Sequence, residues 1–422
     1  MVVGVLTGLM AATFRLVLEH AGRARLELVW WAHGSPVLGF ALVVVGCAAA
    51  TSAAAWLVHR VEPHAEGSGI PRVEAVVEGR TPPGRFRILP VKYLGGVLSI
   101  GAGLALGREG PSVQMGGTIA VIVGTVLRRS LPDVRLLVAA GAAAGLATAF
   151  NAPIAGGVFV LEELVRRFDP RTTLATLVAS GAGFASAHLL LHDSTAADFH
   201  VPPLTDPTLA QAPLVFAVGV SCGLLGVAYN AAVMGSLRIA DTSRWPVVAR
   251  AALIGAAVGA VGWIAPTVVG GGDNLTQQAL LGQGSIAGVT GLLALRFGLG
   301  VLSYAACTPG GLFAPMLVLG SHLGLLVGLV GHLVAPHQTP DPAALALIGM
   351  AAFFTATVRA PVTGIVLATE MTGSTTQLAP MLGACAIAML TATMLRSTPI
   401  YDQLTRRAVS AFRVNAAEAH ET

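Results

Sequence analysis

Charged residues are scarce in this sequence. Only 11% of its 422 residues are Asp, Glu, Lys or Arg, whereas about 25% is usual for a soluble globular domain. Hydrophobic residues make up 54% of the chain, and the mean hydropathy is +0.75. The shortage of charge excludes a soluble domain of any size. It predicts an all-α polytopic membrane protein that forms a single transmembrane domain over residues 1–422.

Lysine is almost absent, because Lys92 is the only one, and arginine carries nearly all of the formal charge of +4. So small an excess does not indicate a nucleic-acid partner. The positive-inside rule assigns arginine-rich loops to the cytoplasm. These clusters are Arg80 to Arg87; Arg128, Arg129 and Arg135; Arg166, Arg167 and Arg171; Arg238, Arg244 and Arg250; and Arg406 and Arg407. The acidic segments His192 to Thr208 and Pro336 to Ala343 are expected outside. Arg23 and Arg25 conflict with this scheme.

Cysteine is also rare. The four cysteines, Cys47, Cys222, Cys307 and Cys385, all lie in apolar stretches. Their spacings match no disulfide or metal framework, so we expect packing residues, no metal site and no cofactor.

Long apolar runs, by contrast, recur along the whole chain. Each can cross, or nearly cross, a hydrocarbon core of about 30 Å. The runs are Pro36 to Val58, Leu174 to Leu191, Ala212 to Val233, Ala251 to Val268, Ala287 to Ala306, Leu345 to Val358 and Leu378 to Leu395. The apolar start, Met1 to Leu18, lacks the basic region of a signal peptide, so we expect it to be a retained first helix. More than ten helical segments in one membrane domain are predicted.

Two apolar runs are interrupted in the same way, at Gly107–Pro111 and Gly311–Pro315. Glycine permits an irregular turn, and proline loses no hydrogen bond in the first turn of a helix. Each break predicts a helix start with unpaired backbone N–H groups, which attract an anion. Gly67–Pro71 predicts a third start with the Ser68 hydroxyl at its tip. A kink or an N-cap explains any one alone, but three together favour an anion pathway.

An internal repeat relates the two interruptions. An offset of 204 aligns Gly107, Pro111 and Gly116 with Gly311, Pro315 and Gly320. An offset of 208 aligns Gly141, Ala143, Ala144, Ala152, Pro153, Gly156, Val158 and Glu162 with Gly349, Ala351, Ala352, Ala360, Pro361, Gly364, Val366 and Glu370. Low-complexity coincidence is the weaker explanation, because paired Pro and Glu are rare in membrane segments. The predicted halves are residues 1–207 and 208–408, followed by a short cytoplasmic tail, 409–422.

Glu109 lies within the first break. A carboxylate at a helix N-terminus is stabilised by the helix dipole alone, but it also fits the anion site that its own helix creates. Protonation would remove its charge and release it from that site. Because intramembrane carboxylates are costly, we favour Glu109 as both the gate of an anion path and a proton carrier.

Glu162 and Glu163 end the apolar run that begins at Ala152. Glu162 has a repeat partner in Glu370, which indicates a structural carboxylate common to both halves. Glu163 has no such partner and is the better candidate for a proton entrance from the cytoplasm, although a solvated helix end fits the residues equally well.

One enzyme-like pattern also occurs. Gly219-Val220-Ser221-Cys222-Gly223 fits the G-x-S-x-G motif of a hydrolase nucleophile, but it lies in an apolar run rather than at a strand-to-helix elbow. We therefore expect that the protein is not an enzyme. An intramembrane serine hydrolase built on Ser221 is a remote alternative.

Four ordered motifs resemble the CLC family of chloride channels and chloride/proton antiporters over nearly the whole chain. They are Gly67-Ser68-Gly69-Ile70-Pro71, Gly107-Arg108-Glu109-Gly110-Pro111, Gly311-Leu312-Phe313-Ala314-Pro315 and a late Tyr401. Ala142 to Glu163 and Ala360 to Gly373 are similar too. The resemblance implies an inverted repeat of two halves with many tilted and broken helices. It also implies a homodimer in the lipid bilayer with one anion path per subunit.

Carried over by position, the resemblance implies that bound chloride, the substrate, is held by the hydroxyls of Ser68 and Tyr401 and the backbone N–H groups of Leu312 and Phe313. It makes Glu109 the external gate and Glu163 the internal proton-transfer residue of the antiporters. Serine at position 68 is similar to chloride-selective members, whereas proline there would suggest nitrate.

The sequence also departs from the family. We expect no counterpart of the short amphipathic helix that begins many members, and none after Tyr401 of the paired regulatory domains of many eukaryotic members. The predicted function is exchange of chloride for protons across a bacterial inner membrane. A passive chloride channel gated by voltage or pH is the alternative.

Overall fold

The computed structural model describes residues 1–191, 198–336 and 339–408, and the predicted tail lies outside these residues. Within them the chain is helical and forms no β-strand, which confirms the all-α prediction. Eight helices are long and apolar enough to cross a membrane. The four cysteines, all described, are buried and unpaired, as expected of packing residues.

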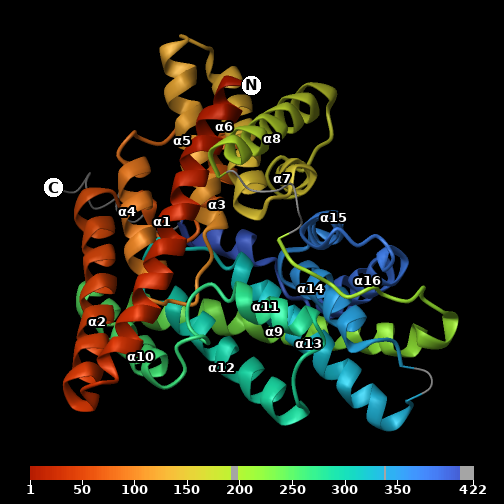
Figure 1. Cartoon of the computed structure of the whole chain (residues 1–422). Coiled ribbons are helices and arrows are strands. Elements are labelled where there is room, and N and C mark those ends of the chain that lie inside the picture. The colour runs from red at the N-terminus through yellow and green to blue at the C-terminus, as the bar shows by residue number, and fades with distance from the viewer. Residues whose placement is uncertain (192–197, 337–338, 409–422) are drawn as a thin grey trace.

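The helices α1 to α16 form two sets of eight that correspond in order, and two of the pairs have equal lengths (Figure 1). Both α1 and α9 have 31 residues, and both α3 and α11 have 8. The first set is α1 (Val2–Ala32), α2 (Pro36–Val61), α3 (Ile70–Val77), α4 (Ile88–Gly101), α5 (Glu109–Val126), α6 (Leu131–Phe150), α7 (Pro153–Phe159) and α8 (Pro170–Leu191). The second is α9 (Ala212–Thr242), α10 (Val247–Ile264), α11 (Asp273–Leu280), α12 (Ile286–Tyr304), α13 (Phe313–Val334), α14 (Pro342–Val358), α15 (Pro361–Thr372) and α16 (Leu378–Met394). A last helix spans residues 400–408.

Equivalent helix pairs pack through equivalent glycines. A Cβ on Gly116 of α5 would overlap the carbonyl oxygen of Gly141 in α6, and a Cβ on Gly320 of α13 would lie 2.5 Å from that of Gly349 in α14. The backbones therefore approach each other closely, as small residues allow between membrane helices. These four glycines belong to the two aligned segments of the sequence, so the sequence repeat corresponds to a repeated helix contact.

Each half supplies a carboxylate that caps a helix of the other half. Glu162 accepts hydrogen bonds from the backbone N–H groups of Val362 (3.0 Å) and Thr363 (2.7 Å) at the start of α15. Glu370 accepts the equivalent bonds from Ile154 (3.0 Å) and Ala155 (2.6 Å) at the start of α7. Each carboxylate satisfies N–H groups that its partner helix cannot pair internally. The structure agrees with the structural role expected of Glu162.

We expect Glu162→Ala and Glu370→Ala each to destabilise the protein by about 1–2 kcal/mol, because each removes two charge-assisted caps. Thermal unfolding of the detergent-solubilised protein measures the loss. Glu27→Ala is the control, since Glu27 is exposed on α1. An unfolding midpoint equal to that of the control in both variants would show that the exchanged caps contribute nothing.

The structure also resolves the position of Arg23 and Arg25. Both lie within α1, which continues to Ala32, so only residues 33–35 connect it to α2. The Arg25 guanidinium donates to the carbonyl of Pro266 at 3.3 Å. Both arginines line a hollow that also contains Glu109. Arg23 and Arg25 therefore belong to the wall of a cavity and not to a basic loop.

Candidate functional site

The two sequence breaks lie directly against each other. The N–H of Gly107 donates to the carbonyl of Gly311, and the N–H of Gly311 donates to that of Gly107, both at 2.8 Å. The pair is antiparallel and joins the segment that enters α5 to the segment that enters α13. Equivalent residues of the two repeats thus meet at one point.

The third motif, Gly67–Pro71, is hydrogen-bonded to the segment that enters α13. The N–H of Gly67 donates to Thr308 at 3.2 Å, and that of Gly310 donates to Gly67 at 3.0 Å. Gly67 and Gly69 have φ of +62° and +79°, which L side chains rarely adopt. Three segments far apart in sequence are therefore held together by backbone hydrogen bonds just before their helices begin.

The three helices begin where the sequence predicts. They start at Ile70 (α3), Glu109 (α5) and Phe313 (α13), and the starts are buried, with Leu312 and Phe313 both 0% exposed. First-turn N–H groups have no partner within their own helix, and the helix dipole adds positive potential there. Their assembly in the interior gives a binding place for an anion without a side-chain cation.

Ser68 stands at the tip of α3. Its hydroxyl accepts a hydrogen bond from the N–H of Ile70 at 3.3 Å, and its own N–H donates to the Tyr304 hydroxyl at 3.4 Å. A Cβ on Gly110 would lie 2.8 Å from the Ser68 Cβ, so the starts of α3 and α5 are in contact. Lys92 of α4, also buried, donates to the carbonyl of Gly67 at 2.6 Å and fixes this turn.

Tyr401 lies in the last helix. Its side chain is 0% exposed, and its hydroxyl has no hydrogen-bond partner among the described residues. The ring packs edge-on against Phe159 at 6.3 Å between centroids, and Phe159 lies 5.3 Å from Phe313 at the start of α13. A buried hydroxyl without a partner is costly, so this donor fits a ligand beside Phe313.

The helix that carries Tyr401 is fixed at the protein surface by Arg407. Its guanidinium donates to both carboxylate oxygens of Asp241, at 2.7 and 2.8 Å, and to Glu66 at 3.1 Å. Hydrogen bonding to Asp241 raises the pKa of Arg407, which therefore remains charged. The contact joins the last helix to the end of α9 and to the segment before α3.

Glu109 is the first residue of α5 and is 3% exposed. Its Oε2 is buried without a hydrogen-bond partner among the described residues, and it lies close to Gly107 and to Ala314, the second residue of α13. A Cβ on Gly107 would overlap Glu109 Oε2, so only glycine leaves room for this position. The carboxylate thus occupies the region between two helix starts, where an anion would be attracted.

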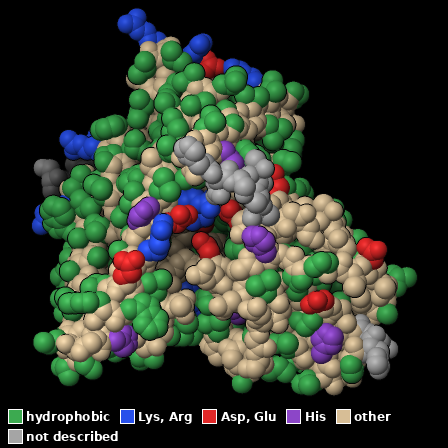
Figure 2. Space-filling view, in the orientation of Figure 1, with side chains coloured by type: hydrophobic (Ala, Val, Ile, Leu, Met, Phe, Trp, Pro, Cys, Tyr) green, Lys and Arg blue, Asp and Glu red, His purple; other side chains and the backbone are tan. Residues whose placement is uncertain are grey.

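One side of Glu109 opens toward the surface. Glu109 and Arg108 line two adjoining hollows of ≈ 160 Å³ and ≈ 360 Å³. Figure 2 shows acidic and basic side chains gathered around a hollow near the centre of this face, while hydrophobic side chains cover much of the rest. In a membrane protein with so few charges, such a gathering marks a water-accessible mouth.

Glu163 lies in a separate buried cluster, near the predicted cytoplasmic arginines. It is 4% exposed, and its Oε1 has no hydrogen-bond partner among the described residues. Arg166 Nη2 lies 3.8 Å from this oxygen and 3.4 Å from Glu74 Oε1, and it also pairs with Asp402. This cluster is distinct from the hollow that Glu109 lines.

Ser221 is not part of this assembly. It lies within α9, and the neighbouring Gly219 and Gly223 pack against Ile387 and Thr391 of α16. The G-x-S-x-G pattern is thus explained by close helix packing rather than by a nucleophile elbow. Among the described residues no group of three His, Cys, Asp or Glu side chains is arranged to hold a metal ion.

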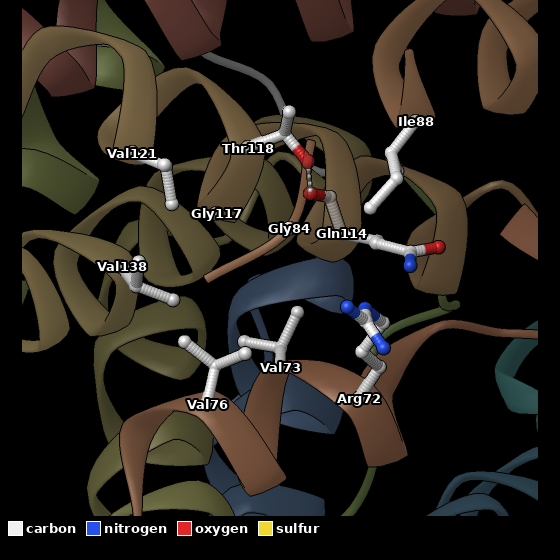
Figure 3. Close-up of a pocket in the computed structure, with 10 residues that line it drawn as sticks. All are labelled: Arg72, Val73, Val76, Gly84, Ile88, Gln114, Gly117, Thr118, Val121 and Val138. Carbon is white, nitrogen blue, oxygen red and sulfur yellow. Dashed lines mark hydrogen bonds between the residues drawn. The ribbon is translucent and has the colours of Figure 1, made fainter. Parts of the chain in front are cut away.

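A small pocket between α3, α4, α5 and α6 is also separate (Figure 3). Its volume of ≈ 20 Å³ suits about one water molecule. Figure 3 shows polar side chains at one end and valines at the other; the labelled residues include Arg72, Gln114, Val73, Val76, Val121 and Val138. The amide of Gln114 donates to the carbonyl of His64 at 2.7 Å. The pocket is too small for a transport pathway.

Sequence reasoning missed several residues that support the site. Adding 204 to Lys92 gives Arg296, and adding 204 to Ser99 gives Ser303. Ser99 donates to the carbonyl of Pro309 before α13 at 2.6 Å, and Ser303 accepts from the N–H of Ala105 before α5 at 2.9 Å. The offset that aligns the two breaks is the signal that identifies these pairs.

Comparison with known proteins agrees with this architecture. The family model described as "Voltage gated chloride channel" matches residues 48–393. The H(+)/Cl(-) exchange transporter ClcA of Salmonella paratyphi A is 34% identical over 416 residues, covering 97% of this chain and 88% of the relative. The transporter of the same name from Salmonella typhimurium is 33% identical over 427 residues, covering 100% and 90%.

Solved structures give the same result. A crystal structure of a slow cyanobacterial Cl-/H+ antiporter matches with a TM-score of 0.92 and 31% identity, covering 97% of this chain and 96% of that one. A CLC-type fluoride/proton antiporter matches in fold alone, with a TM-score of 0.77 and 23% identity over 95% of each chain. The inverted-repeat fold, the joined helix starts and these matches lead to one conclusion: this multi-pass membrane protein belongs to the CLC family of chloride channels and chloride/proton antiporters.

Proposed function

We propose that this protein exchanges chloride for protons across the bacterial inner membrane. One observation carries the proposal: the carboxylate of Glu109 is buried at the start of α5, beside Gly107 and close to Ala314 at the start of α13. A group that is both titratable and negatively charged competes with chloride for this position. Its protonation removes the negative charge, so entry of chloride and uptake of a proton are linked at one side chain.

In this proposal chloride is held by four groups that surround the buried helix starts. The Ser68 and Tyr401 hydroxyls and the N–H groups of Leu312 and Phe313 donate to it. The support is the burial of all four residues, together with the partnerless Tyr401 hydroxyl. Neutral donors bind the ion without the strong attraction of a fixed cation, which allows it to leave again.

Protons follow a partly different route. Glu109 exchanges protons with the two hollows that it lines, which we assign to the external side of the membrane. Glu163 exchanges protons with the cytoplasm. The burial of Glu163 and its proximity to the half-exposed Arg166 support this role, because the cluster joins the interior to the surface. The two routes share the region around Tyr401.

We further propose a homodimer with one pathway per subunit, and repeat halves of residues 1–207 and 208–408. Exposed apolar side chains on α7, α8, α15 and α16 offer a face that a second subunit covers. They are Ile154, Leu174, Leu177, Val362 and Leu382. The exchanged caps of Glu162 and Glu370 lie beside this face and give it a fixed shape.

The test is simultaneous measurement of both ions in liposomes that contain the purified protein. When only a chloride gradient is imposed, protons are expected to move uphill against their own gradient. Liposomes without protein provide the baseline. Chloride flux without proton movement would overturn exchange and support the alternative, a passive channel gated by voltage or pH.

The remote alternative, a serine hydrolase, is tested with the same preparation. Ser221→Ala is expected to leave chloride flux and proton coupling intact, and a serine-directed probe is expected to leave the protein unlabelled. Labelling that Ser221→Ala abolishes would support hydrolysis.

A further inference from the structure

The two hollows beside Glu109 are lined by residues of both repeats, and Asp273 of α11 is among them. Asp273 is the first residue of α11, and its Oδ2 lies 3.6 Å from Arg108 Nη1. Asp273, Arg108 and Glu109 line the same two hollows. The Asp273 side chain is 57% exposed, whereas that of Arg108 is 16% exposed. Asp273 therefore stands on the water side of Arg108, next to the proposed gate.

The turn that places Asp273 is clamped by a buried arginine. Arg296 of α12 is 1% exposed, and its guanidinium donates to the carbonyls of Val268 (2.9 Å), Gly270 (2.8 Å) and Gly271 (2.8 Å). Gly272, which follows, has φ of +97°. A cation buried in a membrane domain is costly unless it is paired or hydrogen-bonded. Its hydrogen bonds go to three backbone carbonyls of the turn that leads into α11.

This clamp repeats the one on the opposite side of the site. Lys92 of α4 is buried and donates to the carbonyls of Ala65 (3.0 Å) and Gly67 (2.6 Å), just before α3. Arg296 occupies the equivalent position on α12, and it binds the turn that precedes α11. The Lys92 clamp positions Ser68 at the tip of α3. By the same geometry the Arg296 clamp positions Asp273 at the tip of α11.

We propose that Asp273, held against Arg108 by the turn that Arg296 clamps, sets the external proton concentration at which Glu109 leaves the anion path. This inference rests on the proposed role of Glu109 as the external gate. Asp273 is a positioning residue, because it acts through Arg108 and through its own charge rather than by contact with the transported ions.

Several other charged groups face the same hollow and contribute to its potential. They pair mainly among themselves: Arg15 lies 2.9 Å from Glu19 and 3.6 Å from Asp198. The charged groups that line the hollows are Arg15, Glu19, Arg23 and Arg25 of α1, Arg108 and Glu109 of α5, Asp198 before α9, and Asp273 of α11, with Arg296 behind the turn. Asp273 forms an ion pair with Arg108, the immediate neighbour of Glu109.

The expected sign follows from Coulomb interactions. The Asp273 carboxylate offsets the charge of Arg108 and adds negative potential near Glu109. Both effects favour the protonated form of Glu109. Without the carboxylate, Arg108 would stabilise ionised Glu109 more strongly, and a higher proton concentration would be needed to open the path.

The test is the pH dependence of chloride flux in liposomes for Asp273→Asn, with equal pH on both sides. The pH of half-maximal flux is expected to move toward acid by roughly half a unit, since the side chain is half-exposed and partly screened by water. Asp273→Glu keeps a carboxylate at this position, so its midpoint should equal that of the unmodified protein. Arg296→Lys should shift it in the same direction as Asp273→Asn, because a lysine cannot reach all three carbonyls. Repeating Asp273→Asn in a Glu163→Gln background restricts the readout to the external gate.

Glu27→Gln is the matched control, since it removes a carboxylate from the same protein but outside the hollow. A midpoint for Asp273→Asn that equals the control, or that moves toward alkaline pH, would overturn the inference. Glu109→Ala separates this failure from a failure of the proposed function. If Glu109→Ala removes the pH dependence while Asp273→Asn leaves it unchanged, only the role of Asp273 is wrong.

Discussion

Replacing Glu109 with alanine is expected to abolish proton movement while chloride flux continues. The carboxylate lies at the start of α5, close to Ala314 in the first turn of α13. Alanine removes both the competitor for the anion position and the external proton carrier. Proton transport driven by a chloride gradient should fall at least tenfold, to the baseline of liposomes without protein.

The pH dependence gives a second readout of the same variant. In the unmodified protein chloride flux should rise as the external solution becomes more acidic, because protonated Glu109 leaves the anion position. In Glu109→Ala this rise should disappear. Glu109→Gln should behave in the same way, because glutamine is a permanently neutral isostere of the protonated side chain. Uphill proton movement by either variant would remove Glu109 from the mechanism.

Replacing Glu163 with glutamine should also abolish proton transport, but by blocking the cytoplasmic end of the route. Glu163 is 4% exposed and lies 3.8 Å from Arg166, whose own side chain is 42% exposed. Glutamine keeps the shape of the side chain but cannot carry a proton. Chloride flux should persist, since Glu163 is distinct from the residues proposed to hold chloride.

A difference in pH dependence distinguishes this variant from Glu109→Ala. Glu163→Gln retains Glu109, so its chloride flux should still rise with external acidity. Glu27→Gln is the matched control, because Glu27 is an exposed carboxylate on α1, away from this cluster. Normal coupling in Glu163→Gln would mean that protons reach Glu109 by another path. Lost coupling in Glu27→Gln as well would mean that the effect is not specific to Glu163.

The two carboxylates are expected to act differently because their surroundings differ. Glu109 lies at the start of α5, where the backbone N–H groups also attract an anion. Glu163 faces a side-chain cluster that contains Arg166, Glu74 and Asp402. Competition with chloride is therefore possible at Glu109 and not at Glu163. The equivalent position to Glu109 in the second repeat is Phe313, and this asymmetry leaves one gate rather than two.

Much of the site was predictable because its chemistry is local. A glycine-rich turn followed by proline specifies a helix start wherever it occurs, so α3, α5 and α13 begin at the predicted motifs. The scarcity of charge makes each intramembrane carboxylate informative. The repeat also indicated that Glu162 and Glu370 have one structural role. These features depend on few residues near one another in the chain.

Other features depend on contacts between distant segments. Nothing near Gly107 in the sequence specifies that its N–H bonds to Gly311, 204 positions away. The placement of Arg25 in the wall of a hollow, and the use of Arg296 to clamp a turn some 25 residues earlier, likewise arise from packing. A sequence pattern cannot identify them, because the partner is a backbone carbonyl, which every residue possesses.

The sequence by itself determined a broken-helix membrane protein with three anion-attracting helix starts and a carboxylate in one of them, because local turn chemistry and the cost of intramembrane charge suffice for that. Only the tertiary structure decided that the breaks bond to each other, that the Glu109 carboxylate lies close to Ala314 in α13, and that Asp273 stands beside Arg108. The physical reason is that these contacts join the two repeats. Their geometry is fixed by the packing of whole helices rather than by any one segment.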